Sequence, residues 1–95
     1  SIFEGDPAWK VTLAGPVASI ICQKYERPTF IFKKNEDESY GSVRIFADDQ
    51  NSVEAMKTCS DILLTFGGHP KASGFRVKPV DLEKFKSRLI EYFTK

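Results

Sequence analysis

The 95-residue chain has few of the side chains that bind metals or form crosslinks, with one histidine, two cysteines and one methionine. Because His69 stands alone and carboxylates cluster only at Asp48 and Asp49, we expect neither a metal nor a cofactor in this chain. Cys22 and Cys59 lie too far apart for a zinc knuckle. We expect them to be buried free thiols, as in a cytosolic protein.

Long apolar runs are also missing. None approaches the roughly 20 residues that cross a bilayer, and the N-terminus lacks the basic and apolar regions of a signal peptide. We therefore expect no membrane partner and a cytoplasmic location. The length of 95 residues suits one domain with one core. The chain begins at Ser1 without a methionine, so we expect it to be a fragment of a longer protein.

An excess of charge of one sign is missing too, because the net charge is only +1, which argues against a general polyanion binder. The distribution is uneven, however: residues 35–61 hold seven acids against two bases, whereas residues 67–95 hold seven bases against three acids. Local charge steers an anionic ligand, so the basic third is a candidate anion-binding region. The alternative is that Lys84, Lys86 and Arg88 only form the solvated face of a helix.

Apolar spacing predicts the order strand, helix, strand, strand, helix, strand, helix. This order implies an α/β (α+β) fold, a small mixed β-sheet of about four to five strands with helices packed on it. The first helix is expected to begin at Gly15 with Pro16 in its first turn, and to end before Pro28. Ahead of it, residues 2–3 and 9–13 are candidate strands. The expected buried stripe of this helix is Val17, Ile20, Ile21 and Tyr25.

The middle of the chain predicts two strands. Residues 29–32 form a continuous apolar run, which is typical of a central strand covered on both faces. Residues 40–46 alternate, which places Ser42 and Arg44 on one face and Val43 on the other.

The second half predicts two helices around a short strand. Asn51 followed by Glu54 is a capping-box pattern, and it opens a helix expected to end at Gly67. Residues 75–78 predict a strand, and Asp81 is expected to cap the last helix. Val80 is expected to pack on Phe85 as a hydrophobic staple. The expected buried stripes of the two helices are Met56, Cys59, Leu63 and Phe66, then Leu82, Phe85, Leu89 and Phe93.

Residues 66–75, FGGHPKASGF, are the most informative stretch, and we expect them to form a turn from helix to strand. Gly67 and Gly68 can adopt positive φ, and consecutive amides in such a turn form a concave nest for an anion. His69 and Lys71 add donors beside it, so phosphate is the natural ligand. The alternative is that the glycines only end a helix, for which one glycine suffices.

Arg44, in the middle of a predicted strand, is the second candidate. Its guanidinium suits bidentate contact with phosphate, and Gly41 and Ser42 before it allow a close approach of the backbone. An arginine that faces water from an edge strand explains the spacing equally well, so the residues alone leave both interpretations open.

Four motifs together resemble the accessory domain of the DHH phosphoesterase superfamily, closest to its RecJ branch of single-stranded-DNA exonucleases. They are Trp9 with the helix start 15–19, Arg27-Pro28, the strand motif 41–44, and the glycine–histidine turn 66–75. The resemblance covers most of residues 9–77 and implies one DHH-associated, substrate-binding domain over residues 1–95. The residues that it implies for phosphate contact are Ser42, Arg44, Gly67, Gly68, His69 and Lys71.

The resemblance also implies partners outside this chain. Such enzymes hydrolyse phosphodiesters with manganese or magnesium held by aspartates and paired histidines. With His69 as the sole histidine, those ligands would lie in an N-terminal catalytic domain of the same protein. We therefore expect no catalytic residue here, a metal-dependent hydrolase as the parent, and single-stranded nucleic acid as the substrate, as in DNA repair.

Other branches remain as alternatives. The nanoRNases and cyclic-dinucleotide phosphodiesterases tend to carry four glycines before the histidine, and alanyl-tRNA synthetase lacks the His-Pro pair. A non-catalytic interaction module is the alternative of another class. Lys10, Thr12 and Ser73 depart from the RecJ pattern, in which His, Gly and Ala are usual. Trp9, Tyr40 and Phe46 are the aromatic candidates for base stacking, although core packing is the favoured interpretation for each.

Overall fold

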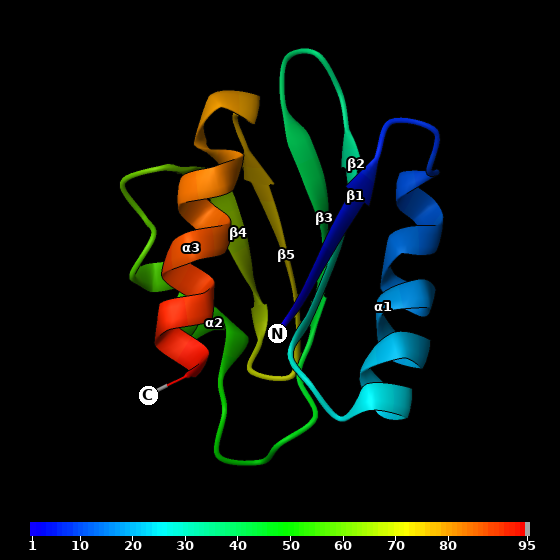
Figure 1. Ribbon diagram of the computed structural model, residues 1–95, viewed down its shortest axis with the longest axis vertical. Helices are drawn as coiled ribbons and strands as arrows, with labels where there is room; N and C mark the ends of the chain where they lie inside the picture. Colours follow the sequence, from blue (N-terminus) through cyan, green and yellow to red (C-terminus); the bar gives the residue numbers. More distant parts are fainter. Residues whose placement is uncertain (95) are drawn as a thin grey trace.

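The computed structural model describes residues 1–94 as a five-stranded mixed sheet with helices on both faces (Figure 1). The elements are β1 Ile2–Asp6, α1 Val11–Tyr25, β2 Thr29–Lys34, β3 Ser39–Arg44, α2 Ser52–Lys57, β4 Leu63–His69, β5 Ala72–Val77, the 3-10 helix η1 Pro79–Asp81 and α3 Leu82–Phe93. The strand order is β1-β2-β3-β5-β4, with β1 parallel to β2 and the other pairs antiparallel. The predicted α/β fold is confirmed.

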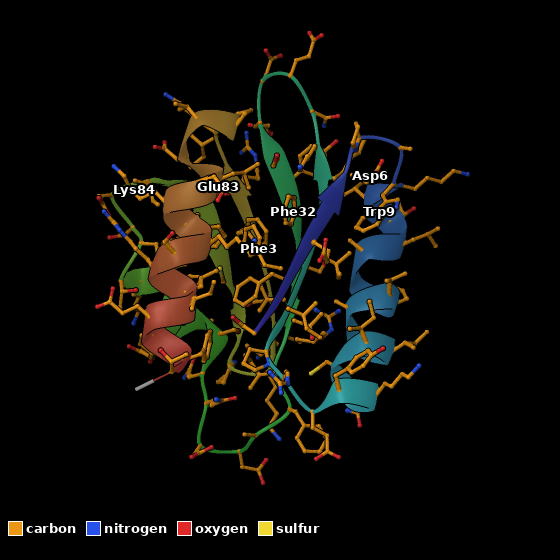
Figure 2. The ribbon with its side chains drawn as sticks, viewed as in Figure 1. Phe3, Asp6, Trp9, Phe32, Glu83 and Lys84 are labelled. Atoms are coloured by element: carbon orange, nitrogen blue, oxygen red, sulfur yellow. The ribbon has the colours of Figure 1, made fainter. Side chains whose placement is uncertain are left out.

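The larger core lies between the sheet and helices α2 and α3. Every residue from Thr29 to Phe32 is buried, which confirms the predicted central strand. The ring centroids of Phe75 and Phe85 lie 5.0 Å apart in an edge-to-face arrangement, and those of Phe3 and Phe32 lie 4.8 Å apart. Figure 2 shows Phe3 and Phe32 on the side of the sheet that faces α3. Aromatic burial on this scale makes this face the main source of stability.

Helix α1 covers the opposite face with small side chains. The predicted large stripe is wrong except at Ile21, which packs partly on the core at this face. Its buried residues are Ala14, Gly15, Ala18 and Cys22, whereas Ile20 is 69% exposed. The helix begins at Val11 and not at Gly15, because the turn after β1 ends there and Leu13 N already donates to Lys10 O at 3.0 Å. Pro16 therefore lies inside the helix, and residues 9–13 are not a strand.

Helix α2 has only six residues, so the predicted helix to Gly67 is wrong. Its predicted N-cap is confirmed, because the Asn51 side chain accepts hydrogen bonds from Val53 N and Glu54 N at 3.0 and 3.1 Å. Residues 63–69 instead form the edge strand β4, in which Phe66 pairs with Phe75. The apolar residues of this segment have helical spacing, but its pairing with β5 makes it a strand.

Helix α3 buries Phe85 and Leu89, with Leu82 and Phe93 packed at the edge of the core, which confirms the predicted stripe. Val80 is 83% exposed, so the predicted staple does not form. Asp81 occupies the N-cap position without a side-chain cap hydrogen bond.

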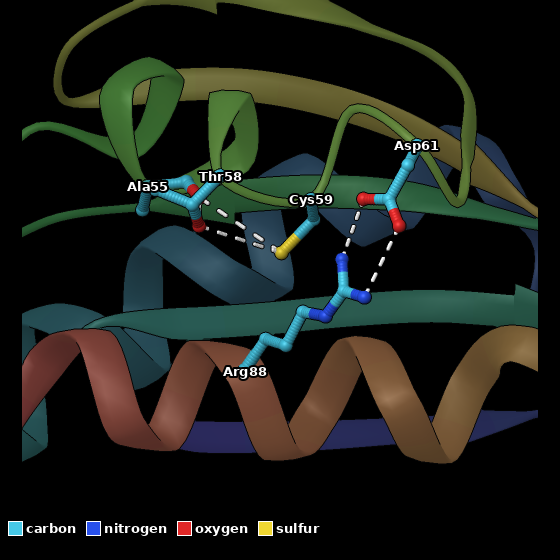
Figure 3. A network of polar contacts seen from close by, with 5 residues as sticks. All are labelled: Ala55, Thr58, Cys59, Asp61 and Arg88. Carbon is cyan, nitrogen blue, oxygen red and sulfur yellow. Dashed lines mark hydrogen bonds and ion pairs between the residues drawn. The ribbon is translucent and has the colours of Figure 1, made fainter.

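An ion pair joins α3 to the loop after α2. Arg88 donates to both carboxylate oxygens of Asp61, at 2.5 and 3.1 Å, and this contact lowers the pKa of Asp61 (Figure 3). Cys59 lies beside the pair, and burial raises the pKa of its thiol. Burial likewise raises the pKa of Cys22. Both cysteines are buried and free, as predicted.

No helix within residues 1–94 combines the length and the apolar character needed to cross a membrane.

Candidate phosphate-binding site

The glycine–histidine segment forms a β-hairpin, and the predicted turn from helix to strand is wrong. Gly67, Gly68 and His69 end strand β4, and the chain turns at Pro70 and Lys71 into β5. Successive amide N–H groups of a strand point in opposite directions, so the two glycines do not form the predicted nest. They offer bare backbone without side chains.

Three consecutive carbonyls fix this turn to Ile45, which follows β3, and to Ser52, which begins α2. The Ser52 hydroxyl donates to His69 O at 3.2 Å, Ser52 N donates to Pro70 O at 2.8 Å, and Ile45 N donates to Lys71 O at 3.0 Å. The buried Ser52 hydroxyl also lies 2.6 Å from the hydroxyl of Ser73, one of the three residues that depart from the RecJ pattern. The backbone of His69 is therefore held in place independently of its side chain.

The strand register brings the two predicted motifs together on one face of the sheet. Side chains of directly paired residues lie on the same face of a sheet. Two rows follow from the pairing across β3, β5 and β4: Arg44–Ala72–His69 and Ser42–Gly74–Gly67. The predicted placement of Ser42 and Arg44 on one face is confirmed, since Val43 between them lies in the core on the other side. Arginine and histidine side chains thus flank a floor of Ala72 and glycine backbone.

This face is open beyond helix α1. The helix packs on β2 and β3, while Gly67 and His69 on β4 are exposed. A Cβ built on Gly67 would meet no atom within 4 Å, so the space above it is free. Gly68, by contrast, has φ +136°, and a Cβ there would lie 2.8 Å from Ala72 O. The first glycine leaves room above the sheet, whereas the second is required by the backbone.

Gly15 of α1 makes room for the Arg44 guanidinium, a contact that sequence reasoning missed. A Cβ on Gly15 would lie 2.8 Å from Arg44 Nη2 and 3.6 Å from Ser42 Oγ. Arg44 Nη1 donates to Val43 O at 2.8 Å. A glycine on the buried stripe of a helix was the available signal for such a close approach.

Arg44 has no carboxylate partner among residues 1–94, in contrast to two other arginines of the chain. Arg76 pairs with Glu38 at 2.8 Å, and Arg88 pairs with Asp61. A half-buried guanidinium without a carboxylate keeps its charge, and the donors that Val43 O does not use, for an external anion.

Lys71 is already paired within the domain. Its ammonium donates to the carboxylate of Asp48, and this contact lowers the pKa of Asp48. The pair is exposed on both sides and ties the hairpin turn to the loop before α2. The predicted phosphate contact of Lys71 would therefore compete with Asp48.

The donor set does not fit a metal ion. No group of three or more His, Cys, Asp or Glu side chains that could hold one occurs within residues 1–94. His69 shares its face with Arg44, a cation that would repel a metal. Any metal used by a protein that contains this domain would need ligands from elsewhere.

The chain also matches a known domain family. Residues 2–95 match the profile of the DHHA1 domain, and the chain belongs to this family. Two relatives are RecJ proteins. The single-stranded-DNA-specific exonuclease RecJ of Bacillus subtilis (strain 168) is 35% identical in an alignment of 88 residues, and the alignment covers 87% of this chain and 11% of the relative. RecJ from Thermus thermophilus, solved in complex with Mg²⁺, is 33% identical with a TM-score of 0.83 over 96% of this chain and 14% of its own.

The fold is shared more widely than the sequence. The C-Ala domain of alanyl-tRNA synthetase from Aquifex aeolicus has a TM-score of 0.72 and 15% identity, with 93% of this chain and 88% of that domain covered. This likeness shows the fold alone. The RecJ relatives share both sequence and fold with this chain, so the chain is a DHH-associated domain similar to that of the RecJ proteins.

Proposed function

We propose that this chain is the substrate-binding domain of a longer, RecJ-like phosphodiesterase and that it grips phosphates of single-stranded nucleic acid. The chain spans only 11–14% of the length of the RecJ proteins reported above, so the activity belongs to the assembled protein. A cytoplasmic location, in which Cys22 and Cys59 stay reduced, is part of the same proposal.

One observation carries this function: the register aligns Arg44 and His69 across three strands above an open floor. Arg44 has no carboxylate partner among the described residues. Charge-assisted hydrogen bonds from a guanidinium to phosphate are about twice as strong as neutral ones. The floor lets a phosphate and its sugar approach the sheet without steric conflict, since the space above Gly67 is free.

The part played by this chain is to bind and orient the substrate. Arg44 would donate to non-bridging phosphate oxygens, Ser42 in the neighbouring row would donate its hydroxyl, and His69 would donate from the far side of the floor. Donors held in place before the reaction stabilise the charge that develops on the phosphate. The manganese or magnesium that the family resemblance implies would be bound by the remainder of the protein.

The test uses the longer protein. Arg44→Ala and His69→Ala should each lower single-turnover cleavage of a single-stranded oligonucleotide roughly tenfold or more, because a charge-assisted contact contributes about 1.5–3 kcal/mol. Melting temperatures should change little, because Arg44 is only half-buried and His69 is exposed. Lys84→Ala, an exposed change on α3, is the matched control. If both variants cleave at the parental rate, the proposed site is wrong.

A further inference from the structure

Helix α1 carries a second apolar stripe that faces away from the sheet. Leu13 is 53% exposed, Val17 is 38% exposed and Ile20 is 69% exposed, and their spacing places them on one side of the helix. Small residues face the sheet on the other side. A helix that is apolar on two faces is normally buried on both, so the outer stripe lacks a partner within this domain.

The outer stripe borders a groove beside the first turn of α1, which we call the Trp9 groove. Its volume is about 470 Å³, and its lining includes Trp9, Lys10, Leu13, Val17, Ile31 and Phe32. Trp9 is 40% exposed and lies beside the start of α1 (Figure 2). Core packing of Trp9, the favoured interpretation from the sequence, is therefore wrong.

The structure holds Trp9 in this exposed position. Lys33 Nζ donates to Pro7 O at 2.7 Å and to Trp9 O at 3.0 Å, and Ala8 N donates to an Asp6 carboxylate oxygen at 2.7 Å. A rigid turn that presents an indole beside exposed leucine and valine resembles the apolar centre of a protein interface. Of the two lysines that line the groove, Lys10 and Lys33, the ammonium of Lys33 is therefore already hydrogen-bonded to backbone carbonyls.

We propose that the Trp9 groove is the docking surface for the remainder of the longer polypeptide to which the proposed function assigns this chain. The length of the RecJ relatives supports this occupant, because most of each relative lies outside the matched region. Ile31 in the lining of the groove pairs with Ser42 across β2 and β3.

Two other occupants are outcomes that the test below distinguishes. A second copy of this chain would pair the same surface with itself in a twofold dimer, and the protection that it gives would rise with concentration. A nucleobase would stack on Trp9, but the lining beyond it is mainly aliphatic, and Lys10 alone would remain for the phosphate. A convex apolar protein segment fits both the shape and the chemistry.

Cysteine labelling tests this assignment. Leu13→Cys is compared in the 95-residue chain and in the longer protein by the rate of maleimide addition, followed by mass spectrometry of the peptide that contains residue 13. Ile90→Cys on α3, at a site 42% exposed, is the matched control. Native Cys22 and Cys59 are buried and should react slowly in both. Circular dichroism confirms that each variant is folded.

We expect position 13 to react roughly tenfold or more slowly in the longer protein, because access controls thiol modification, while position 90 reacts equally in both. Equal rates at position 13 would overturn the proposal. So would protection in the 95-residue chain that rises with concentration, which indicates a second copy, or protection that requires an added oligonucleotide. Cleavage by the Arg44→Ala variant is measured separately, so failure of the phosphate site and failure of the groove are distinguishable.

Discussion

Replacing Gly15 with alanine should separate activity from stability. The new methyl group would lie 2.8 Å from Arg44 Nη2, whereas ordinary contact begins at 3.4 Å. The guanidinium is the far end of a flexible side chain, so it can move away at little cost to the fold. The movement would, however, take the guanidinium out of the row that Arg44 forms with Ala72 and His69.

This geometry has two opposite effects, a gain in the stability of the domain and a loss of turnover. Alanine is favoured over glycine inside a helix by about 1 kcal/mol, which for a domain of this size would raise the melting temperature by roughly 4–8 °C. Loss of a charge-assisted phosphate contact costs about 1.5–3 kcal/mol, which is roughly a tenfold to hundredfold loss of turnover. Gly15→Ala should therefore keep or raise stability while it lowers activity.

The assay measures the melting temperature on the 95-residue chain and single-turnover cleavage on the longer protein that carries the same change. Gln23→Ala, at an exposed position of the same helix, controls for helix propensity alone. A Gly15→Ala variant that melts several degrees lower and cleaves at the parental rate would refute the reasoning, because Gly15 would then serve packing and not the position of Arg44.

Three further results are expected. Gly67→Ala should keep the melting temperature and lower cleavage, whereas Gly68→Ala, at φ +136°, should lower the melting temperature; equal melting temperatures would contradict this contrast. Ser52→Ala should cost about 1–3 kcal/mol in urea unfolding, because it leaves the buried hydroxyl opposite without its partner; unchanged stability would refute the role of that hydrogen bond. The hydrogen bond from Arg76 lowers the pKa of Glu38 below its ordinary value of 4.5. The stability that this hydrogen bond contributes is therefore fully present above pH 4.5 and is lost as the pH falls through the lowered pKa of Glu38. The difference in melting temperature between the parent and Arg76→Gln should then shrink below pH 4.5, and a constant difference would count against it.

The sequence was informative where a feature depends on residues that are close together in the chain. Asn51 predicted its cap, the apolar run 29–32 predicted a central strand, and the spacing of Ser42 and Arg44 predicted their shared face. Each of these depends on neighbours in the chain. Local pattern was therefore enough for these parts of the fold and for half of the candidate site.

Other features depended on contacts between distant segments. The spacing from Met56 to Phe66 fits a helix, but pairing with β5 makes residues 63–69 a strand. The large apolar residues of α1 suggested the buried stripe, but the sheet accepts only small ones beside Arg44, and Leu13 faces outward. The alignment of His69 with Arg44 exists only through β5, and no spacing along the chain reveals it.

The hairpin that carries His69 is fastened through main-chain carbonyls at three successive positions, 69, 70 and 71. A carbonyl oxygen is present whatever the side chain is, so the anchorage does not depend on residue identity at these positions. Variation there can alter the chemistry presented to a ligand while the loop keeps its shape. Lys71, whose side chain is tied only to an exposed carboxylate, can therefore be replaced while its carbonyl keeps the hairpin in place.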